Sequence, residues 1–129
     1  MKTLRVGIAS YEQMKARTMA IARGELRPAA GEPKVWFRSA ESFARVLSDR
    51  NRALLGIIAE STPESLARLA ELTGRKKSNL SRTLKTMEGY GFVKLSRGAR
   101  GSVIPRVPYQ RISLTLPLVT PDREETEVA

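Results

Sequence analysis

The sequence predicts a mainly α-helical fold with small β elements, in which three core helices are followed by a β-hairpin. Residues 61–89 contain two short amphipathic helical patterns joined at Gly74. Residues 92–107 contain two short apolar runs separated by a tip rich in glycine and arginine. Two helices at a tight corner, followed by a hairpin, are the order of a winged helix-turn-helix. An additional N-terminal strand and helix and a C-terminal strand flank this predicted core.

Composition limits the functions that this fold can carry. The 129 residues suffice for one compact domain with an appendage, or for one half of a dimer. Lys and Arg total 23 against 13 for Asp and Glu, a formal net charge of +10 that favours polyanionic partners. Cysteine and histidine are absent, which excludes disulfides, zinc clusters and imidazole catalysis. We therefore expect no cofactor, no metal and no enzymatic activity.

The N-terminal region, residues 1–34, is predicted to serve dimerisation or contact with a partner. Thr3 to Ile8 alternates apolar and polar residues, as in a half-buried strand. A helical pattern follows from Ser10 to Leu26, with a narrow face made of Tyr11, Met14, Thr18, Ile21 and Ala22. Such a face is expected to pack against the rest of the fold or against a second chain. Arg27 to Lys34 holds two prolines and a glycine and is predicted to be a linker.

Two helices are expected after a short apolar anchor at Val35, Trp36 and Phe37. Ser39 is a candidate N-cap for the first helix, which would turn Phe43, Val46 and Leu47 inward. Ser48 or Asp49 would cap the second, whose buried set is Leu54, Leu55, Ile57 and Ile58. Gly56 interrupts this most apolar segment, at a cost of about 1 kcal/mol relative to alanine.

The first helix of the tight pair is predicted to begin at Thr62. Thr62 would be the N-cap, Pro63 the first helical residue and Glu64 a favourable charge at the positive end of the helix. The inward side would consist of Leu66, Leu69, Ala70 and Leu72. Gly74 can adopt the left-handed backbone that ends a helix, and its small size lets the next helix approach.

The second helix of the pair carries the clearest functional signal. Leu80, Leu84 and Met87 fall on one side, and the other side holds Arg75, Ser78, Asn79, Arg82, Lys85 and Thr86. An ordinary solvated face usually mixes charges that support the helix. From Arg75 to Arg100, however, there are eight basic residues and one acid, Glu88. Such self-repulsion is relieved by an external anion, and Ser, Asn and Arg can donate to phosphates and to base edges.

The hairpin and the C-terminal strand complete the predicted fold. Phe92, Val93 and Leu95 would form one hairpin strand, and Val103, Ile104 and Val107 the other. Arg97 and Arg100 in the tip can follow the DNA backbone or enter the minor groove, or they simply solubilise a loop. The predicted DNA-binding domain therefore comprises residues 35–107 and ends with this hairpin.

Residues 108–129 are expected to form one more strand and a disordered acidic tail. Arg111 to Leu118 alternates like a strand, in which Pro117 belongs at an edge or at the end. Thr120 to Ala129 is polar and mildly acidic, as in a solvated tail. The two terminal strands are expected to pair with each other or with their copies in a second subunit.

The segment TGRKKSNLSRTLKTMEGYGFVKL resembles the recognition-helix region of MarR- and ArsR-type winged helix-turn-helix regulators. In those regulators a Ser/Thr-rich helix with a central Arg is followed by an acid, a glycine and an apolar strand start. The matching positions are Ser78, Ser81, Arg82, Glu88, Gly91 and Phe92. The order from Phe37 to Val107, with the strand RISLTLPL behind it, also resembles small prokaryotic predicted regulators of toxin-antitoxin-like operons.

Three features depart from that resemblance. Lys76 stands where the family commonly has a capping Ser or Thr, and Thr83 replaces a usual aliphatic residue. The chain also lacks the long C-terminal dimerisation helices of typical MarR proteins. Any dimer is therefore expected to use the N-terminal strand and helix and the C-terminal strand.

These observations predict a cytoplasmic, homodimeric regulator that binds double-stranded DNA sequence-specifically, most simply as a repressor. Arg82 and Asn79 are expected to contact bases, and Arg97 and Arg100 the flanking backbone. The complete predicted DNA-binding set is Arg75, Lys76, Lys77, Ser78, Asn79, Ser81, Arg82, Lys85, Arg97 and Arg100. The cytoplasmic location is expected because the sequence shows neither a signal peptide nor an apolar stretch of the roughly 20 residues that span a membrane.

The sequence leaves one alternative function open and disfavours three others. The terminal strands could clamp a partner protein such as a toxin, which would make the chain an antitoxin with DNA binding for autoregulation. Binding to structured RNA is less favoured, because aromatic residues are only 5% of the chain. Catalysis by Ser78 and Lys77 is disfavoured because neighbours on a helix point about 100° apart. Membrane-surface binding is disfavoured because no Trp/Phe-rich face accompanies the charge.

Overall fold

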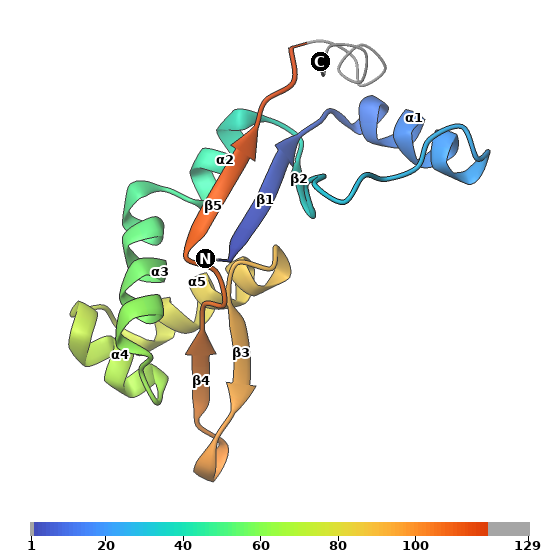
Figure 1. Ribbon diagram of the computed structural model, residues 1–129. Helices are drawn as coiled ribbons and strands as arrows, with labels where there is room; N and C mark the ends of the chain where they lie inside the picture. The colour runs from blue at the N-terminus through green and yellow to red at the C-terminus, as the bar shows by residue number, and fades with distance from the viewer. Residues whose placement is uncertain (1, 119–129) are drawn as a thin grey trace.

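The computed structural model describes residues 2–118, which form five α-helices and two small β-sheets (Figure 1). This agrees with the expected mainly α-helical class with small β elements. The predicted acidic tail, residues 120–129, lies outside the described residues. Along the chain, the elements fall into a terminal-strand sheet with its attached helix and a group of helices with a hairpin.

A three-stranded sheet joins the two ends of the described chain. Its central strand is β1 (Thr3–Ile8), flanked by β2 (Val35–Phe37) and β5 (Arg111–Thr115). Both neighbours run parallel to β1, with Val6 opposite Val35 on one side and opposite Leu114 on the other. The prediction that the terminal strands pair with each other is confirmed. Val35–Phe37 was expected only as an apolar anchor, and the structure makes it a strand.

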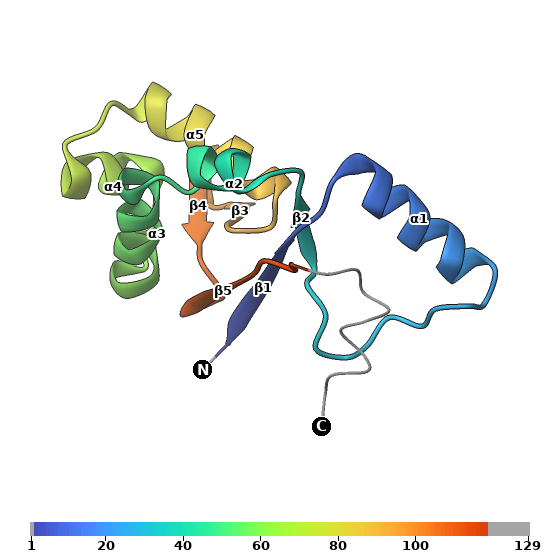
Figure 2. The same cartoon turned by 90° about the horizontal axis from the view of Figure 1, so that it is seen from above.

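Four helices lie on one side of this sheet. They are α2 (Ala40–Val46), α3 (Asp49–Ser61), α4 (Leu66–Thr73) and α5 (Lys77–Gly89). A hairpin follows, made of β3 (Lys94–Arg97), the short 3-10 turn η1 (Ala99–Gly101) and β4 (Val103–Arg106). The first helix, α1 (Tyr11–Ala22), projects away from the other helices, as the view from above shows (Figure 2).

One hydrophobic core unites the sheet and the four helices. Leu4 and Val6 of β1 belong to the same buried cluster as the apolar residues of α3, α4 and α5, namely Leu54, Leu55, Ile58, Leu66, Leu69, Leu80, Leu84 and Met87. Phe37 of β2 stacks on Tyr90, with ring centroids 4.5 Å apart, and so ties the sheet to the end of α5. The apolar anchor therefore packs as expected, although α2 itself has no fully buried residue.

The predicted start of α4 was wrong. Thr62 does not cap this helix but ends α3, in a left-handed conformation with φ of 41°. Ser65 is the N-cap, and its hydroxyl accepts a hydrogen bond from the Arg68 backbone N–H at 3.1 Å. Pro63 is buried in the connection, where its carbonyl accepts a hydrogen bond from Arg106 Nη1 at 2.6 Å. This contact from β4 fixes Pro63 outside the helix.

Several other expected boundaries also shift. α1 ends at Ala22, not Leu26, because Gly24 takes a positive φ of 77°. Phe92 and Val93 are buried immediately before β3 and are not part of it. β5 ends at Thr115 instead of Leu118, two residues before Pro117, which has no N–H to donate to a ladder. Of the residues expected to face inward on α4, Leu72 is instead exposed.

Candidate nucleic-acid interface

α5 separates an apolar side from a polar, basic side. Leu80, Leu84 and Met87 are almost completely buried and fix the helix against the core. Most residues around the rest of the helix are solvent-exposed, namely Lys77, Ser78, Asn79, Arg82, Lys85, Thr86, Glu88 and Gly89, whereas Ser81 and Thr83 are half-buried. Because apolar contacts hold α5 in place, its polar side chains are not needed to anchor it. They are available to a ligand.

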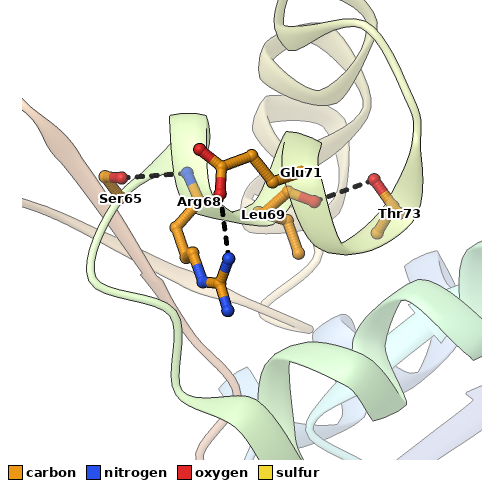
Figure 3. Close-up of polar contacts among 5 residues, drawn as sticks. All are labelled: Ser65, Arg68, Leu69, Glu71 and Thr73. Atoms are coloured by element: carbon orange, nitrogen blue, oxygen red, sulfur yellow. Dashed lines mark hydrogen bonds and ion pairs between the residues drawn. The ribbon is translucent and has the colours of Figure 1, made fainter.

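Hydrogen bonds at the end of α4 fix the turn before α5, and Figure 3 shows the one between Thr73 and Leu69. The Thr73 hydroxyl donates to the Leu69 carbonyl at 2.9 Å and accepts from the Arg75 backbone N–H at 3.2 Å. Gly74 ends α4 with φ of 71°, and its N–H donates to the Ala70 carbonyl at 2.8 Å. α4 and α5 also contact each other directly. The first residues of α5 therefore have a defined position relative to α4.

The beginning of α5 has no side-chain cap. Lys76 occupies the N-cap position, with extended backbone but no capping hydrogen bond. Because Lys76 stands where a Ser or Thr cap is common, backbone N–H groups in the first turn of α5 have no side-chain acceptor from the N-cap. These N–H groups and the positive end of the helix dipole add to the charges of Lys76 and Lys77. The start of α5 is the part of the helix best suited to an anion.

Arg75 lies in the turn and not on α5, where it was expected. Its pKa is lowered, first because partial burial removes water from the guanidinium and second because the charge of Arg50 is near. The Arg75 Nε is buried and makes no hydrogen bond to any of residues 2–118. Arg50 belongs to the first turn of α3 and was not among the predicted site residues. It lies 25 positions before Arg75 in the sequence, and no local pattern reveals that the two residues are close.

Acidic side chains do not neutralise the face of α5. The ion pairs found within residues 2–118 are Arg17–Glu32, Arg52–Asp49 and Arg68–Glu71, and none involves α5. The last of these spans one turn of α4, which therefore mixes its charges (Figure 3). Glu88, the single acid among the cations, turns toward the hairpin, where its Oε2 accepts the Leu95 backbone N–H at 3.3 Å. The positive charge of α5 remains uncompensated by described side chains.

The two hairpin arginines differ in their surroundings. Arg97 belongs to β3, and its Nη1 donates to the Gly101 carbonyl at 3.0 Å, which stabilises the tip. Arg100 lies in η1 with φ of 59° and ψ of 27°, a left-handed conformation that is uncommon for arginine. Its side chain is exposed and has no hydrogen bond to the described part of the chain. Arg100 is therefore the better placed of the two for an outside partner.

The ten predicted site residues thus fall into two regions. Lys76, Lys77 and the exposed polar residues of α5 share one helix, with Arg75 beside its start, and Ser81 is only half-buried at the edge of that face. Arg97 and Arg100 occupy the hairpin, which extends away from α5 and from the three-stranded sheet (Figure 1). α5 contacts β3 at the base of the hairpin. The two regions are therefore in contact at the base of the hairpin, but the site residues of the helix and those of the hairpin form two separate groups.

Metal and membrane features are not seen in residues 2–118. This part of the chain holds no group of three His, Cys, Asp or Glu side chains able to bind a metal ion. None of its helices is both long and apolar enough to cross a bilayer.

The fold and the exposed cationic helix define a small, mainly α-helical protein with a positively charged surface. The chain belongs to the HVO_A0114 family, whose model matches residues 46–114, more than half of the sequence. The matched part runs from the end of α2 through the hairpin to β5, and so contains all ten predicted site residues. Comparison with curated proteins and with solved structures finds no match. The family name states no activity.

Proposed function

We propose that this protein is a sequence-specific, double-stranded DNA-binding transcriptional regulator of the winged helix-turn-helix type. In this proposal α3, α4 and α5 are the three-helix core, α5 is the recognition helix and the β3–β4 hairpin is the wing. The observation that carries it is the exposed face of α5, where Ser78, Asn79, Arg82 and Lys85 meet solvent without an acidic partner among the described residues. The resemblance of this helix to MarR- and ArsR-type recognition helices supports the same reading.

The residues of α5 divide by chemistry into base readers and phosphate contacts. Arg82 and Asn79 carry forked donors that fit base edges in the major groove. Lys76, Lys77 and Lys85 act mainly through charge, which serves phosphates of any sequence. Arg75, with Arg50 beside it, adds charge at the start of the helix. Arg100 at the hairpin tip would reach the flanking backbone or the minor groove.

The proposed regulator is a homodimer, because α1 and β5 carry surfaces that the single chain leaves exposed. α1 has no buried residue, and Tyr11 at its start is 64% exposed. β5 is an edge strand of the sheet, and Leu114 in this strand and Leu116 just after it are also exposed. A second copy that covers these residues would present a second α5, so DNA half-sites would recur about one helical turn apart, or a multiple of it. A repressor acting in the cytoplasm is the simplest regulator of this design.

Two substitutions on α5 test the proposal by separating specific from nonspecific binding. Arg82→Ala should cost on the order of 1–3 kcal/mol on the selected sequence and relax specificity. Lys77→Ala should weaken all sequences alike and reduce the salt dependence. Binding would be measured by competition between random duplexes and a sequence selected from a random library.

Lys15→Ala supplies the control, because it removes one exposed charge from α1, far along the chain from α5. Lys15→Ala should not change the ratio of the affinities for selected and random duplexes. If Arg82→Ala also left this ratio unchanged, α5 would not be a base-reading helix.

A second function is favoured by the free edge of β5. An edge strand with unpaired backbone groups and exposed leucines can extend the sheet of another protein. In that case the chain is an antitoxin or similar partner-binding module, and DNA binding serves autoregulation. Co-purification with a small protein encoded beside it would support this function. A stable dimer of this chain alone, with tight operator binding, would count against it.

A further inference from the structure

The strand β5 begins an apolar stripe that the single chain covers only at one end. Ile112, at the start of the stripe, is half-buried on the helix side of the sheet. Leu114 lies opposite Val6 of β1, so both side chains point to that same side. Val6 is completely buried, but Leu114 is 37% exposed. Leu116 and Leu118 continue the alternation with still greater exposure, so the helices leave the second half of the stripe open.

A mostly apolar groove lies beside the covered end of this stripe. One wall comes from Leu55 and Ala59 of α3, and Ile112 of β5 belongs to the other. Its volume is about 230 Å³. α3 lies on the side of β5 that faces away from β1 (Figure 1). The groove and the exposed leucines therefore lie along the same free side of β5.

The backbone of β5 is also free on this side. β5 pairs with β1 on one side, and no strand of residues 2–118 pairs with it on the other. Its five residues, Arg111–Thr115, therefore offer N–H and C=O groups to a further strand. A strand that pairs here would lie beside α3 and could place its own side chains in the groove.

A second copy of β5 fits this edge when the two strands run antiparallel about Ser113. This register pairs all five residues of one strand with all five of the other, which no other register does. It places the partner's Leu114 beside Ile112 and the partner's Leu116 beside Gln110, and both Ile112 and Gln110 line the groove. The apolar side chains of both strands stay on the helix side. The leucines that one copy exposes therefore lie against the groove of the other, as in a twofold-symmetric interface.

Charge favours a second copy as the occupant. The charged side chains that line the groove are Arg52 and Arg111, and none of its lining residues is acidic. In the antiparallel register the partner's Leu118 lies near Pro108, next to the groove. The sequence beyond Leu118 holds four acids and one arginine, namely Asp122, Glu124, Glu125, Glu127 and Arg123. The partner thus brings negative charge to the end of the groove, where the two arginines attract it.

We propose that the edge of β5 is the dimer interface, at which two copies form one continuous six-stranded sheet by antiparallel pairing about Ser113. This inference rests on the proposed homodimer and names its contact surface. α1 lies beyond β2, at the opposite edge of the sheet, and stays outside the interface (Figure 1). Because both apolar faces lie on one side of the joined sheet, both α5 helices lie on that side as well.

Cysteine cross-linking tests the register, because the chain has no cysteine of its own. Opposite residues of antiparallel strands have Cα atoms about 4.5–5.5 Å apart, which a disulfide can bridge. We expect Ser113→Cys to form a covalent dimer on mild oxidation, seen on a non-reducing gel. Thr115→Cys is the matched control, since Thr115 is exposed on the same face of the same strand. Its two copies would lie roughly 13 Å apart, too far for a disulfide.

Leu116→Glu tests the apolar contact between the copies. A carboxylate placed against the groove wall loses water and should raise the dissociation constant of the dimer at least about tenfold. Met19→Glu is the matched control, because Met19 is similarly exposed but belongs to α1. It should leave the dissociation constant unchanged. Sedimentation equilibrium over a range of protein concentrations measures both.

Three outcomes would overturn the proposal. The unmodified chain could stay monomeric, which would leave β5 open to a different protein. Ser113→Cys could cross-link no faster than Thr115→Cys, or Met19→Glu could separate the copies while Leu116→Glu does not, which would move the contact to α1. DNA is absent from these measurements. A failure here leaves the base-reading test of Arg82 untouched, and a failure of that test leaves the interface untouched.

Discussion

α1 and α5 are helices of nearly equal length that are stabilised in opposite ways. α1 has 12 residues and a complete capping box, in which Ser10 and Gln13 satisfy each other's backbone N–H groups, yet it buries none of its residues. α5 has 13 residues and no side-chain cap, yet it buries Leu80, Leu84 and Met87. Local hydrogen bonds define where α1 begins, whereas packing against the core holds α5.

The contacts of α1 with the rest of the fold are peripheral. Arg17 forms an ion pair with Glu32 and lies over the Trp36 ring, 5.4 Å from its centroid. Arg38 lies over Tyr11 at 5.9 Å. Isolated helices of about 12 residues are marginal in water, so such contacts matter. The comparison indicates that packing within one chain holds α5, whereas α1 would gain stability if the proposed second copy covered it.

The largest expected effect removes packing from α5. Leu84→Ala deletes a fully buried side chain and should lower the free energy of unfolding by about 2–5 kcal/mol. Met19→Ala on α1 removes a side chain that is 43% exposed in the single chain and should change the free energy of unfolding of that chain alone, at low protein concentration, by less than about 0.5 kcal/mol. Urea denaturation measures both. A larger loss at Met19 that depends on protein concentration would show that a second copy covers α1.

A smaller effect is expected when the cap of α1 is lost. Ser10→Ala should cost about 1 kcal/mol, but only locally, because α1 contributes no buried residue to the core. Hydrogen exchange should quicken in α1 while the global unfolding midpoint stays nearly constant. Ser48→Ala is the comparison, since Ser48 caps α3, which buries three residues. Ser48→Ala should lower the global unfolding midpoint. If Ser10→Ala and Ser48→Ala lowered this midpoint equally, α1 would not be less coupled to the core than α3.

The smallest expected effect adds the cap that α5 lacks. Lys76→Ser places a hydroxyl at an N-cap with suitable extended backbone and should stabilise the protein by roughly 0.5–1 kcal/mol. In the proposed function it also removes one phosphate contact and should weaken DNA binding. Lys76→Met is the control, since it removes the charge without adding a cap. If Lys76→Met kept full DNA affinity, Lys76 would not contact phosphate.

The sequence predicts those features that depend on local periodicity and fails where distant residues meet. The buried sides of α3 and α5 follow from apolar spacing, and the left-handed Gly74 follows from its place between two patterns. β2 has only three residues, too few to show a period. Thr62 and Ser65 are both acceptable caps by composition, and the contact of Pro63 with Arg106 supplies the tertiary information that separates them.

In the candidate site, too, features within one element could be predicted from the sequence, whereas contacts between elements could not. The face of α5 follows from sequence spacing, because its residues share one helix. The nearness of Arg50 to Arg75 arises only when α3 packs beside the α4–α5 turn.

The parallel pairing of β1 with β5 has a consequence for how the chain folds. Lys2 and Gln110 exchange two hydrogen bonds across 108 positions of sequence, so the central strand acquires its second neighbour only after almost the whole described chain exists. Contacts among α3, α4, α5 and the hairpin span far shorter separations and are expected to form sooner. We therefore expect the edge of β1 that pairs with β5 to stay unpaired during synthesis until β5 has been made. The sheet, whose central strand comes first along the chain, is expected to be the last part of the fold to be completed.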